Sequence, residues 1–269
     1  MTEEAVSRLV ADGSDGLEVA GVTDRGTVRT ENQDAWDAVV RVPDDSGEAD
    51  GAERAGTRVA IVVADGMGGH AGGREAAEAA VEAAIAALRE AGPPRELVEA
   101  AVHDANAAVS GIRELIGGDP GTTLVVAVVE DGRAHIGNVG DSRAYLVRGG
   151  RSEPLTSDHS WVGDEVRAGR LGAEEARHHP RRNIITRAVM GAPVEAEISH
   201  VGVEKDDTLL LCTDGVWEPL SDDDIAQLVS DAGPLVRDLE RLCEAALDAG
   251  GRDNVTAVAV RVRRSGDAA

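Results

Sequence analysis

Residues 59–91 read "VAIVVADGMGGHAGGREAAEAAVEAAIAALREA" and pass from an apolar run, through a glycine-rich stretch, into an alanine-rich one. The apolar run has the length of a β-strand, and the alanine-rich part has the pattern of a helix. Asp65 lies at the expected end of the strand, and residues 66–73 then hold five glycines and His70. Three interpretations are open: a phosphate-binding loop, a metal site, or a simple turn.

The first interpretation, a nucleotide-binding loop, fits poorly. Gly66, Gly68 and Ala71 match the G-x-G-x-x-G/A pattern between a strand and a helix, but that motif also needs a second parallel strand after the helix. Here the helix predicted at 74–91 is followed by a second helical pattern at 94–116. No Gly-Lys-Ser/Thr follows the glycines, so the Walker motif is absent as well.

The composition limits the class of protein. The chain has 269 residues, a length compatible with one domain, and its core must be aliphatic because it has no Phe, one Tyr and three Trp. A net charge of −23 disfavours binding to nucleic acid, which draws affinity from Lys and Arg. An anionic substrate would therefore need local cations.

Two cysteines, Cys212 and Cys243, lie in apolar patterns and are expected in the core. The chain opens with no secretory pattern, and its apolar runs, such as 124–129, are too short to span a bilayer. We therefore expect a soluble, cytoplasmic protein in a reducing compartment, with no membrane association.

Nine short β-rich runs recur along the chain, several joined by hairpin signals such as "EDGR" and "RGGR". They span 17–23, 36–42, 58–64, 122–129, 133–139, 143–148, 197–203, 208–213 and 255–262. Helical patterns cover 74–91, 94–116, about 221–231 and about 234–249. Because strands and helices are grouped rather than alternating, we predict an α+β fold: two antiparallel sheets packed face to face, with antiparallel helix pairs outside.

The remaining segments give the domain limits. Residues 1–16 and 263–269 are polar with little periodicity, so we expect flexible termini. Residues 43–57 predict a long mobile hairpin loop, and the Arg-rich stretch 158–195 predicts a flap outside the sandwich. One domain, 17–262, remains.

Aspartates recur at the ends of the predicted strands. Asp65, Asp141 and Asp214 follow strands, while Asp34 and Asp253 precede them. For a single Asp-Gly pair a turn is the better interpretation. Neighbouring antiparallel strands, however, bring such ends to one edge. Five carboxylates would repel one another unless they held hard cations such as Mg²⁺ or Mn²⁺, and two such ions about 4 Å apart activate water for attack on a phosphoryl group.

Eight segments, in order, resemble the motifs of the metal-dependent type 2C serine/threonine protein phosphatases in their bacterial form, and the resemblance spans residues 17 to about 262. The segments are "TDRGTVRTENQDAW" (23–36), "VADGMGGHAGG" (63–73), "GTTLVV" (121–126), "IGNVGDSRAYL" (136–146), "LTSDHSWV" (155–162), "HPRRNIITRAVMG" (179–191), "LLLCTDGVWE" (209–218) and "GGRDNVTAVAV" (250–260).

The resemblance implies a four-layer α-β-β-α sandwich with a flap, in which residues 17–262 form the catalytic domain. It also implies a ligand set for two Mn²⁺ or Mg²⁺ ions. Asp65 would bridge both ions and the Gly66 carbonyl would bind one of them. Asp214 and Asp253 would hold the other, with Asp34 acting directly or through water.

Further roles follow from the same resemblance. Asp141 matches a position that, with Asp214, holds a third and weaker metal, and Arg29 matches the arginine that clamps the substrate phosphate. The implied reaction is hydrolysis of phosphoserine and phosphothreonine in proteins by a metal-bridged hydroxide, without a phosphoenzyme. The expected partners are phosphoproteins, opposite a serine/threonine kinase, and the expected state is a monomer.

Three positions depart from the family pattern. Gln33 stands where many relatives have Glu, a change that concerns the outer metal ligands. Glu218 stands where relatives often have Asp, a change that concerns the third metal site. Met67 occupies the slot in which some eukaryotic relatives carry a histidine that protonates the leaving group. His70 lies three residues later, and we assign it no such role.

Other candidates have simpler interpretations. The histidines at 178–179 lack the spacing of a zinc site. Cys212 lacks the nearby arginine of a cysteine phosphatase, and Ser142 lacks a histidine at workable spacing for a serine triad. Trp36 and Trp217 adjoin motif aspartates and are expected to pack beneath the site.

Two other functional classes stay open at this point. A regulatory binding module with the phosphatase fold would show lost ligand carboxylates, and none is lost. Another two-metal hydrolase is the second alternative: the acidic surface disfavours a nuclease, whereas nothing in the sequence excludes a small phosphoester as substrate.

Overall fold

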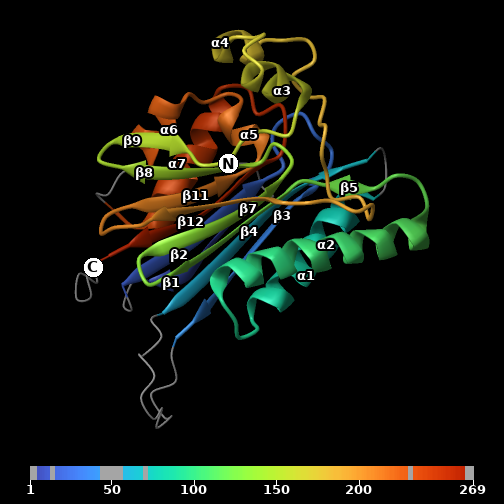
Figure 1. Cartoon of the computed structure of the whole chain (residues 1–269). Helices are drawn as coiled ribbons and strands as arrows, with labels where there is room; N and C mark the ends of the chain where they lie inside the picture. The colour runs from blue at the N-terminus through green and yellow to red at the C-terminus, as the bar shows by residue number, and fades with distance from the viewer. Residues whose placement is uncertain (1–4, 13–15, 43–56, 69–71, 230–232, 264–269) are drawn as a thin grey trace.

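Two antiparallel β-sheets packed face to face form the centre of the molecule (Figure 1). The computed structural model describes residues 5–12, 16–42, 57–68, 72–229 and 233–263. The first sheet has the order β1 (Val6–Asp12), β2 (Leu17–Asp24), β12 (Val255–Val262), β11 (Thr208–Cys212), β8 (Arg143–Arg148), β9 (Arg151–Pro154). The second has the order β10 (Glu197–Gly202), β7 (Arg133–Val139), β6 (Leu124–Glu130), β4 (Arg58–Met67), β3 (Asp34–Arg41), with β5 (Gly121–Thr122) paired to the end of β4.

Helices cover the outer face of each sheet. The second sheet is covered by α1 (Gly73–Leu88) and α2 (Pro94–Ile116), which lie side by side (Figure 1). The first sheet is covered by α5 (Asp214–Trp217), α6 (Asp222–Leu228) and α7 (Leu235–Asp248). The four layers confirm the predicted α+β sandwich.

Strand β4 shows why the central strands are apolar throughout. Val59, Ile61 and Val63 point into the layer between the sheets, whereas the alternate residues Ala60 and Val62 point to α1 and α2. Because both faces of the strand are buried, its sequence lacks the apolar–polar alternation of a one-sided sheet. Strand β11 is likewise buried on both faces. Together these strands form the aliphatic core that the composition predicts.

Helix α2 begins and ends where its sequence predicts. Pro94 occupies the first turn, where its missing N–H is not needed, and Gly117 follows the last turn with φ 72°. The stripe that contains Val98, Val102 and Val109 is fully or almost fully buried. Helix α1 ends at Leu88, three residues before the predicted end.

The segment between β9 and β10 leaves the sandwich and lies over one end of it (Figure 1). It contains two short helices, α3 (Trp161–Arg167) and α4 (Ala173–Arg177). We call residues 158–195 the flap segment. The bridge between Ser160 and Ile185 pairs the start of this segment with a residue in its second half and encloses both helices.

One expectation for the termini is wrong. Residues 6–12, placed in the flexible N-terminus, form β1 and pair with β2 at the edge of the first sheet. A register shift between Leu9 and Ala11 breaks the strand's alternation, and Val6 and Leu9 are 55% and 49% exposed, so the sequence carries no clear strand pattern. Arg8 holds the strand to β3 by stacking on Trp36 and pairing with Asp37.

Other differences are smaller. The predicted run 122–129 is divided in the structure, because Thr122 belongs to the short strand β5 and β6 begins at Leu124. Strand β9 was not among the nine predicted runs, although the "RGGR" hairpin that leads into it was predicted. The loop predicted at 43–57 and the C-terminal residues 264–269 lie largely or wholly outside the described residues. Within the described part of the chain, no helix combines the length and the apolar character needed to cross a membrane.

Candidate active site

The five aspartates singled out in the sequence come from strand ends on one edge of the sandwich. Asp34 begins β3 and lies directly opposite Asp65 on β4 in the antiparallel register. Asp141 lies in the turn between β7 and β8, Asp214 begins α5 directly after β11, and Asp253 precedes β12. Antiparallel pairing therefore places the strand ends as expected.

The electrostatics of the five carboxylates show that they are close enough to interact. Burial raises the pKa of Asp65 well above its usual range, and the charges of Asp34, Asp214, Asp141 and Asp253 raise it further. Asp214 has a similarly raised pKa, from burial first and then from Asp141 and Asp253. Ionised together in the absence of a cation, these groups destabilise one another.

Two of the carboxylates have pKa values near neutrality. Burial raises the pKa of Asp34 to about 7, although hydrogen bonds from Thr256 and Thr213 act in the opposite direction. The Thr213 hydroxyl donates to Asp34 Oδ2 at 2.9 Å. Burial, with the neighbouring charge of Asp158, raises the pKa of Asp141 to about 7.

The backbone of Asp65 is fixed by the short strand β5 and the residue after it. The Asp65 carbonyl accepts hydrogen bonds from the Thr123 amide and the Thr122 hydroxyl, both at 2.9 Å. The Asp65 amide donates to the Thr123 hydroxyl at 2.9 Å. The Thr123 hydroxyl also forms a hydrogen bond with the Ser142 hydroxyl at 2.7 Å. Ser142 therefore helps to position Asp65, and this contact gives no support to a serine catalytic triad.

Gly66 lies where only a glycine fits. A Cβ atom there would be 2.2 Å from the Gly73 carbonyl oxygen and 2.6 Å from that of Gln33. Its amide donates to the Gln33 carbonyl at 3.1 Å. The glycine-rich stretch thus brings three backbone segments together beside Asp65. His70 and Ala71 lie outside the described residues.

Arg29 lies in the loop between β2 and β3 and reaches the cluster. Its Nη2 donates to Asp253 Oδ2 at 2.5 Å, and its pKa is raised, first by this hydrogen bond. The charges of Asp65 and Asp214 raise it as well, and the charge of Arg29 in turn lowers the pKa of Asp34, so Arg29 interacts with four of the five carboxylates. The residue expected to hold the phosphate is therefore paired with an expected metal ligand.

The oxygen atoms of the cluster suit a hard cation. Asp141 Oδ1 and Asp214 Oδ1 are buried and make no hydrogen bond, which is costly for a carboxylate. All the candidate ligands are oxygens, as Mg²⁺ and Mn²⁺ prefer. Among the described residues, however, no three His, Cys, Asp or Glu side chains already stand together as a ligand set. An ion would have to draw the carboxylates inward, and Asp253 away from Arg29.

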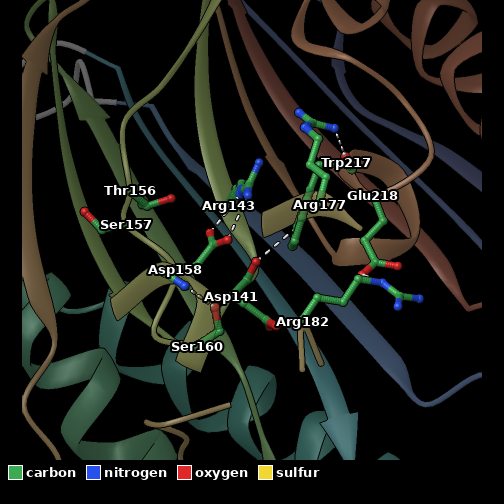
Figure 2. A network of polar contacts seen from close by, with 12 residues as sticks. Asp141, Arg143, Thr156, Ser157, Asp158, Ser160, Arg177, Arg182, Trp217 and Glu218 are labelled. Carbon is green, nitrogen blue, oxygen red and sulfur yellow. Dashed lines mark hydrogen bonds and ion pairs between the residues drawn. The ribbon is translucent and has the colours of Figure 1, made fainter. Parts of the chain in front are cut away.

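A buried stack beside Asp141 was not assigned from the sequence (Figure 2). The Arg143 guanidinium lies 3.6 Å from the centre of the Trp217 ring and forms two hydrogen bonds with Asp158, at 2.8 and 2.7 Å. Trp217 Nε1 donates to the Asp141 carbonyl at 3.0 Å. Trp217 therefore packs beneath the site, as expected, and also fixes the turn that carries Asp141. The sequence run "GDSR" could have pointed to Arg143, but only its aspartate, Asp141, was assigned a role.

Two of the three positions that depart from the family pattern, Glu218 and Gln33, have definite contacts. Glu218 forms an ion pair with Arg182 of the flap segment at 3.1 Å, and its charge acts on Asp141 and Asp214. The amide of Gln33 donates to the Asn254 side chain at 2.8 Å. The Gln33 side chain packs against Gly73, where an added Cβ would lie 3.2 Å from it.

The alternative catalytic groups do not form sites. Cys212 is fully buried, and burial raises the pKa of its thiol, which opposes formation of the thiolate that a cysteine phosphatase needs. His178 is exposed with its Nε2 3.5 Å from Glu174 Oε1, and His179 stacks on Trp161. Neither contact resembles metal coordination.

Comparison with known proteins agrees with this arrangement. The family model for protein phosphatase 2C matches residues 29–257, which include Arg29 and all five aspartates. The chain belongs to the protein phosphatase 2C family. Its fold is that of bacterial phosphatases of this family. The crystal structure of the catalytic domain of the serine/threonine protein phosphatase PstP in complex with two manganese ions is 33% identical. It superposes with a TM-score of 0.77 over 92% of this chain and 98% of that one.

Two curated relatives illustrate the extent of the similarity. The serine/threonine protein phosphatase PstP of Mycobacterium tuberculosis is 36% identical over 254 residues, which cover 91% of this chain but 45% of that protein. The protein phosphatase PhpP of Streptococcus pneumoniae is 36% identical over 252 residues, which cover 91% of this chain and 97% of that protein. The chain thus spans about half of the first relative and nearly all of the second.

Proposed function

We propose that this member of the protein phosphatase 2C family is a metal-dependent protein serine/threonine phosphatase. The observation that carries the proposal is the cluster of five carboxylates on one sandwich edge, with buried, unpaired oxygens on Asp141 and Asp214 and with Arg29 beside it. A bacterial relative crystallised with two manganese ions supports the choice of cofactor.

The proposed roles follow the placement of each group. Asp65 and the Gly66 carbonyl, both on β4, would hold one ion, while Asp214 and Asp253 would hold the second, with Asp65 shared. Asp34, opposite Asp65 on β3, would act directly or through water. Asp141, next to Asp214, would hold a third and weaker ion. When bound, Mn²⁺ or Mg²⁺ ions supply a nucleophile from water and neutralise charge on the phosphoryl group.

Arg29 would hold the substrate phosphate. Its planar guanidinium presents paired donors that match two phosphate oxygens, and it faces the carboxylates that would hold the ions. Release from Asp253 is the condition for this role, and metal binding to Asp253 would provide it. A local cation set of this kind lets a chain of net charge −23 accept an anionic substrate.

The wider setting is also a proposal. The relatives are bacterial protein phosphatases, which supports phosphoprotein substrates, a bacterial signalling role and an opposing serine/threonine kinase. A cytoplasmic location and a monomeric state are part of the same proposal.

Hydrolysis assays test the proposal. Wild-type protein is assayed on an aryl phosphate and on a phosphothreonine peptide, with Mn²⁺, with Mg²⁺ and with chelator, beside Asp65→Asn. We expect turnover of both substrates with metal, none with chelator, and a loss of at least a hundredfold in Asp65→Asn.

The outcomes separate the alternatives. Turnover in chelator, or full activity of Asp65→Asn, would contradict the metal mechanism. Turnover of the aryl phosphate but of no phosphopeptide would favour a phosphatase for small phosphoesters. No turnover of either substrate with any metal would favour a binding module.

A further inference from the structure

A cavity of about 330 Å³ lies beneath the flap segment, between it and the end of the first sheet. Its volume falls at the lower end of the range for small-ligand sites. Nothing in the proposed catalytic roles uses this cavity, which we call the subflap pocket.

Small apolar side chains line part of the subflap pocket. The flap segment contributes Val162 and Val166 from α3 and Ala173 and Ala176 from α4, and Pro154 at the end of β9 lies on the opposite side. These side chains offer hydrophobic contact to a ligand, while charged side chains, among them Arg167 and Asp222, line the rest of the pocket.

The floor of the pocket is held rigidly by the Arg143 stack (Figure 2). The guanidinium of Arg143 is held between Asp158 and the ring of Trp217, and the paired side chains of Arg143 and Asp158 are 17% and 12% exposed. Arg177 ties α4 to the sandwich by donating to the Trp217 and Leu220 carbonyls at 3.2 and 3.3 Å. The pocket is therefore formed before any ligand binds.

The subflap pocket lies next to the candidate active site, although none of the five aspartates lines it. Trp217 lines the pocket and donates to the Asp141 carbonyl, and Glu218 lines it and acts electrostatically on Asp141 and Asp214. Arg182 lies across this junction with its Nε paired to Glu218 (Figure 2). In the described part of the chain its two Nη groups make no hydrogen bond, so they remain available to a ligand at the junction.

The charge of the flap segment suits a phosphorylated polypeptide. It has six arginines and six acidic residues, whereas the whole chain has a net charge of −23. The surface over the pocket thus lacks the strong negative charge of the rest of the molecule, and an anionic chain can approach the metal site from this side.

We propose that the subflap pocket is a substrate specificity site, which receives an apolar side chain of the phosphoprotein close in sequence to the phosphorylated residue. The assignment rests on the proposed phosphatase function. The proximity of the pocket to the proposed phosphate site argues for the substrate itself as occupant, because Trp217 and Glu218 connect the pocket to Asp141 and Asp214 of the carboxylate cluster.

A peptide series tests this site. Phosphothreonine peptides carry one Leu, moved through the four positions on each side of the phosphothreonine, with Ala elsewhere. We expect one position at which Leu raises kcat/KM about tenfold or more over Ala, the usual gain from filling an apolar pocket. An aryl phosphate, which has no flanking side chain, measures the basal activity.

Two substitutions separate the pocket from the rest of the flap segment. Ala173→Trp fills the pocket from α4 and should abolish the Leu preference while aryl phosphate turnover stays within about twofold. Ala168→Trp, at an exposed position outside the pocket, is the matched control and should keep the preference. Val166→Asp places a charge in the wall and should replace the Leu preference by a preference for Lys at the same position.

The possible results are distinct. The inference would be overturned if Leu had no effect on kcat/KM at any position. It would also be overturned if the Leu preference survived both Ala173→Trp and Val166→Asp. Equal losses on peptide and aryl phosphate would assign the pocket to positioning of the flap segment instead, which also overturns it. Failure of the wild type to turn over aryl phosphate with metal would overturn the proposed phosphatase function first.

Discussion

Arg29 and Asp253 form a direct ion pair at the carboxylate cluster, with Nη2 of the arginine 2.5 Å from Oδ2 of the aspartate. The two side chains are 52% and 32% exposed, so solvent weakens the pair and its release costs little. The same aspartate is a proposed metal ligand and the same arginine a proposed phosphate ligand. Under the proposed roles, metal binding and phosphate binding are therefore coupled through this contact.

This coupling predicts an unusual phenotype for Arg29→Ala. Loss of the guanidinium should lower kcat/KM for an aryl phosphate by about a hundredfold, since a charge-assisted contact to the phosphate is lost. Binding of Mn²⁺, measured by calorimetry, should be unchanged or tighter, because a competing cation has left Asp253. Arg252→Ala, at the adjacent exposed position, is the control and should change neither quantity. Weaker Mn²⁺ binding in Arg29→Ala would contradict the coupling.

The raised pKa values predict how the metal-free protein responds to pH. Asp34 and Asp141 have folded-state pKa values of about 7 against an ordinary value near 4, so between these pH values the folded state binds more protons than the unfolded state. The free energy of unfolding should therefore fall as the pH rises from about 4 to 7, and this contribution should level off above 7. Thermal unfolding in chelator at a series of pH values measures it.

Added Mn²⁺ should oppose this loss. Metal binding requires ionised carboxylates, so the increase in Tm on adding Mn²⁺ should be larger at pH 8 than at pH 5. Asp141→Asn removes one of the repelling charges and should raise the Tm of the chelated protein at pH 8, by about 2–4 °C for each kcal/mol gained. A metal-free Tm that rises from pH 5 to pH 8 in the wild type would show that the buried carboxylates are not mutually repelling.

The pair between Arg143 and Asp158 should stabilise the fold more than an exposed ion pair does. Asp158→Ala leaves the buried guanidinium unpaired and should cost about 3 kcal/mol in urea unfolding. Arg143→Met with Asp158→Leu should cost clearly less than the two single changes added together. Glu99→Ala breaks the exposed Arg95–Glu99 pair and should cost less than about 1 kcal/mol. Additive losses at Arg143 and Asp158 would rule out the proposed stabilising pair.

The thiol of Cys212 should be dispensable for catalysis. It is buried in the core beneath the first sheet, and its raised pKa keeps it protonated. Cys212→Ala removes one atom from the core and should leave kcat within about twofold, and a thiol-alkylating reagent should not inhibit the folded wild type. Loss of activity with a retained Tm would instead indicate thiol chemistry.

Most of the sandwich could be predicted because its strands are short apolar runs bounded by turn signals. The run 58–64, for example, became β4, and the helix predicted at 94–116 has those same ends in the structure. Strand β1 was missed because an edge strand with a bulge and exposed Val6 has neither a buried face nor regular alternation. A hydrophobic pattern in the sequence reflects the burial of side chains, and few side chains of β1 are buried.

The candidate site divides in the same way. The placement of Asp34, Asp65 and Asp214 followed from strand ends and antiparallel pairing alone. The stack of Arg143 on Trp217 could not be predicted, since it joins residues more than seventy positions apart by side-chain contact without a pattern in either segment. The ion pair between Arg29 and Asp253 was also beyond the sequence, because it depends on the side-chain arrangement without a metal ion.

The most direct test of the account is to count metal ions and turnover together. Chelator-treated protein is titrated with Mn²⁺ by calorimetry at pH 8, and hydrolysis of a phosphothreonine peptide is followed on the same samples, for the wild type and for Asp65→Asn. We predict that wild-type turnover rises as two sites per chain fill, and that Asp65→Asn binds fewer ions and hydrolyses no peptide. Full turnover before any metal is added, or an Asp65→Asn protein as active as the wild type, would contradict the proposal that this carboxylate cluster is a metal-dependent phosphatase site.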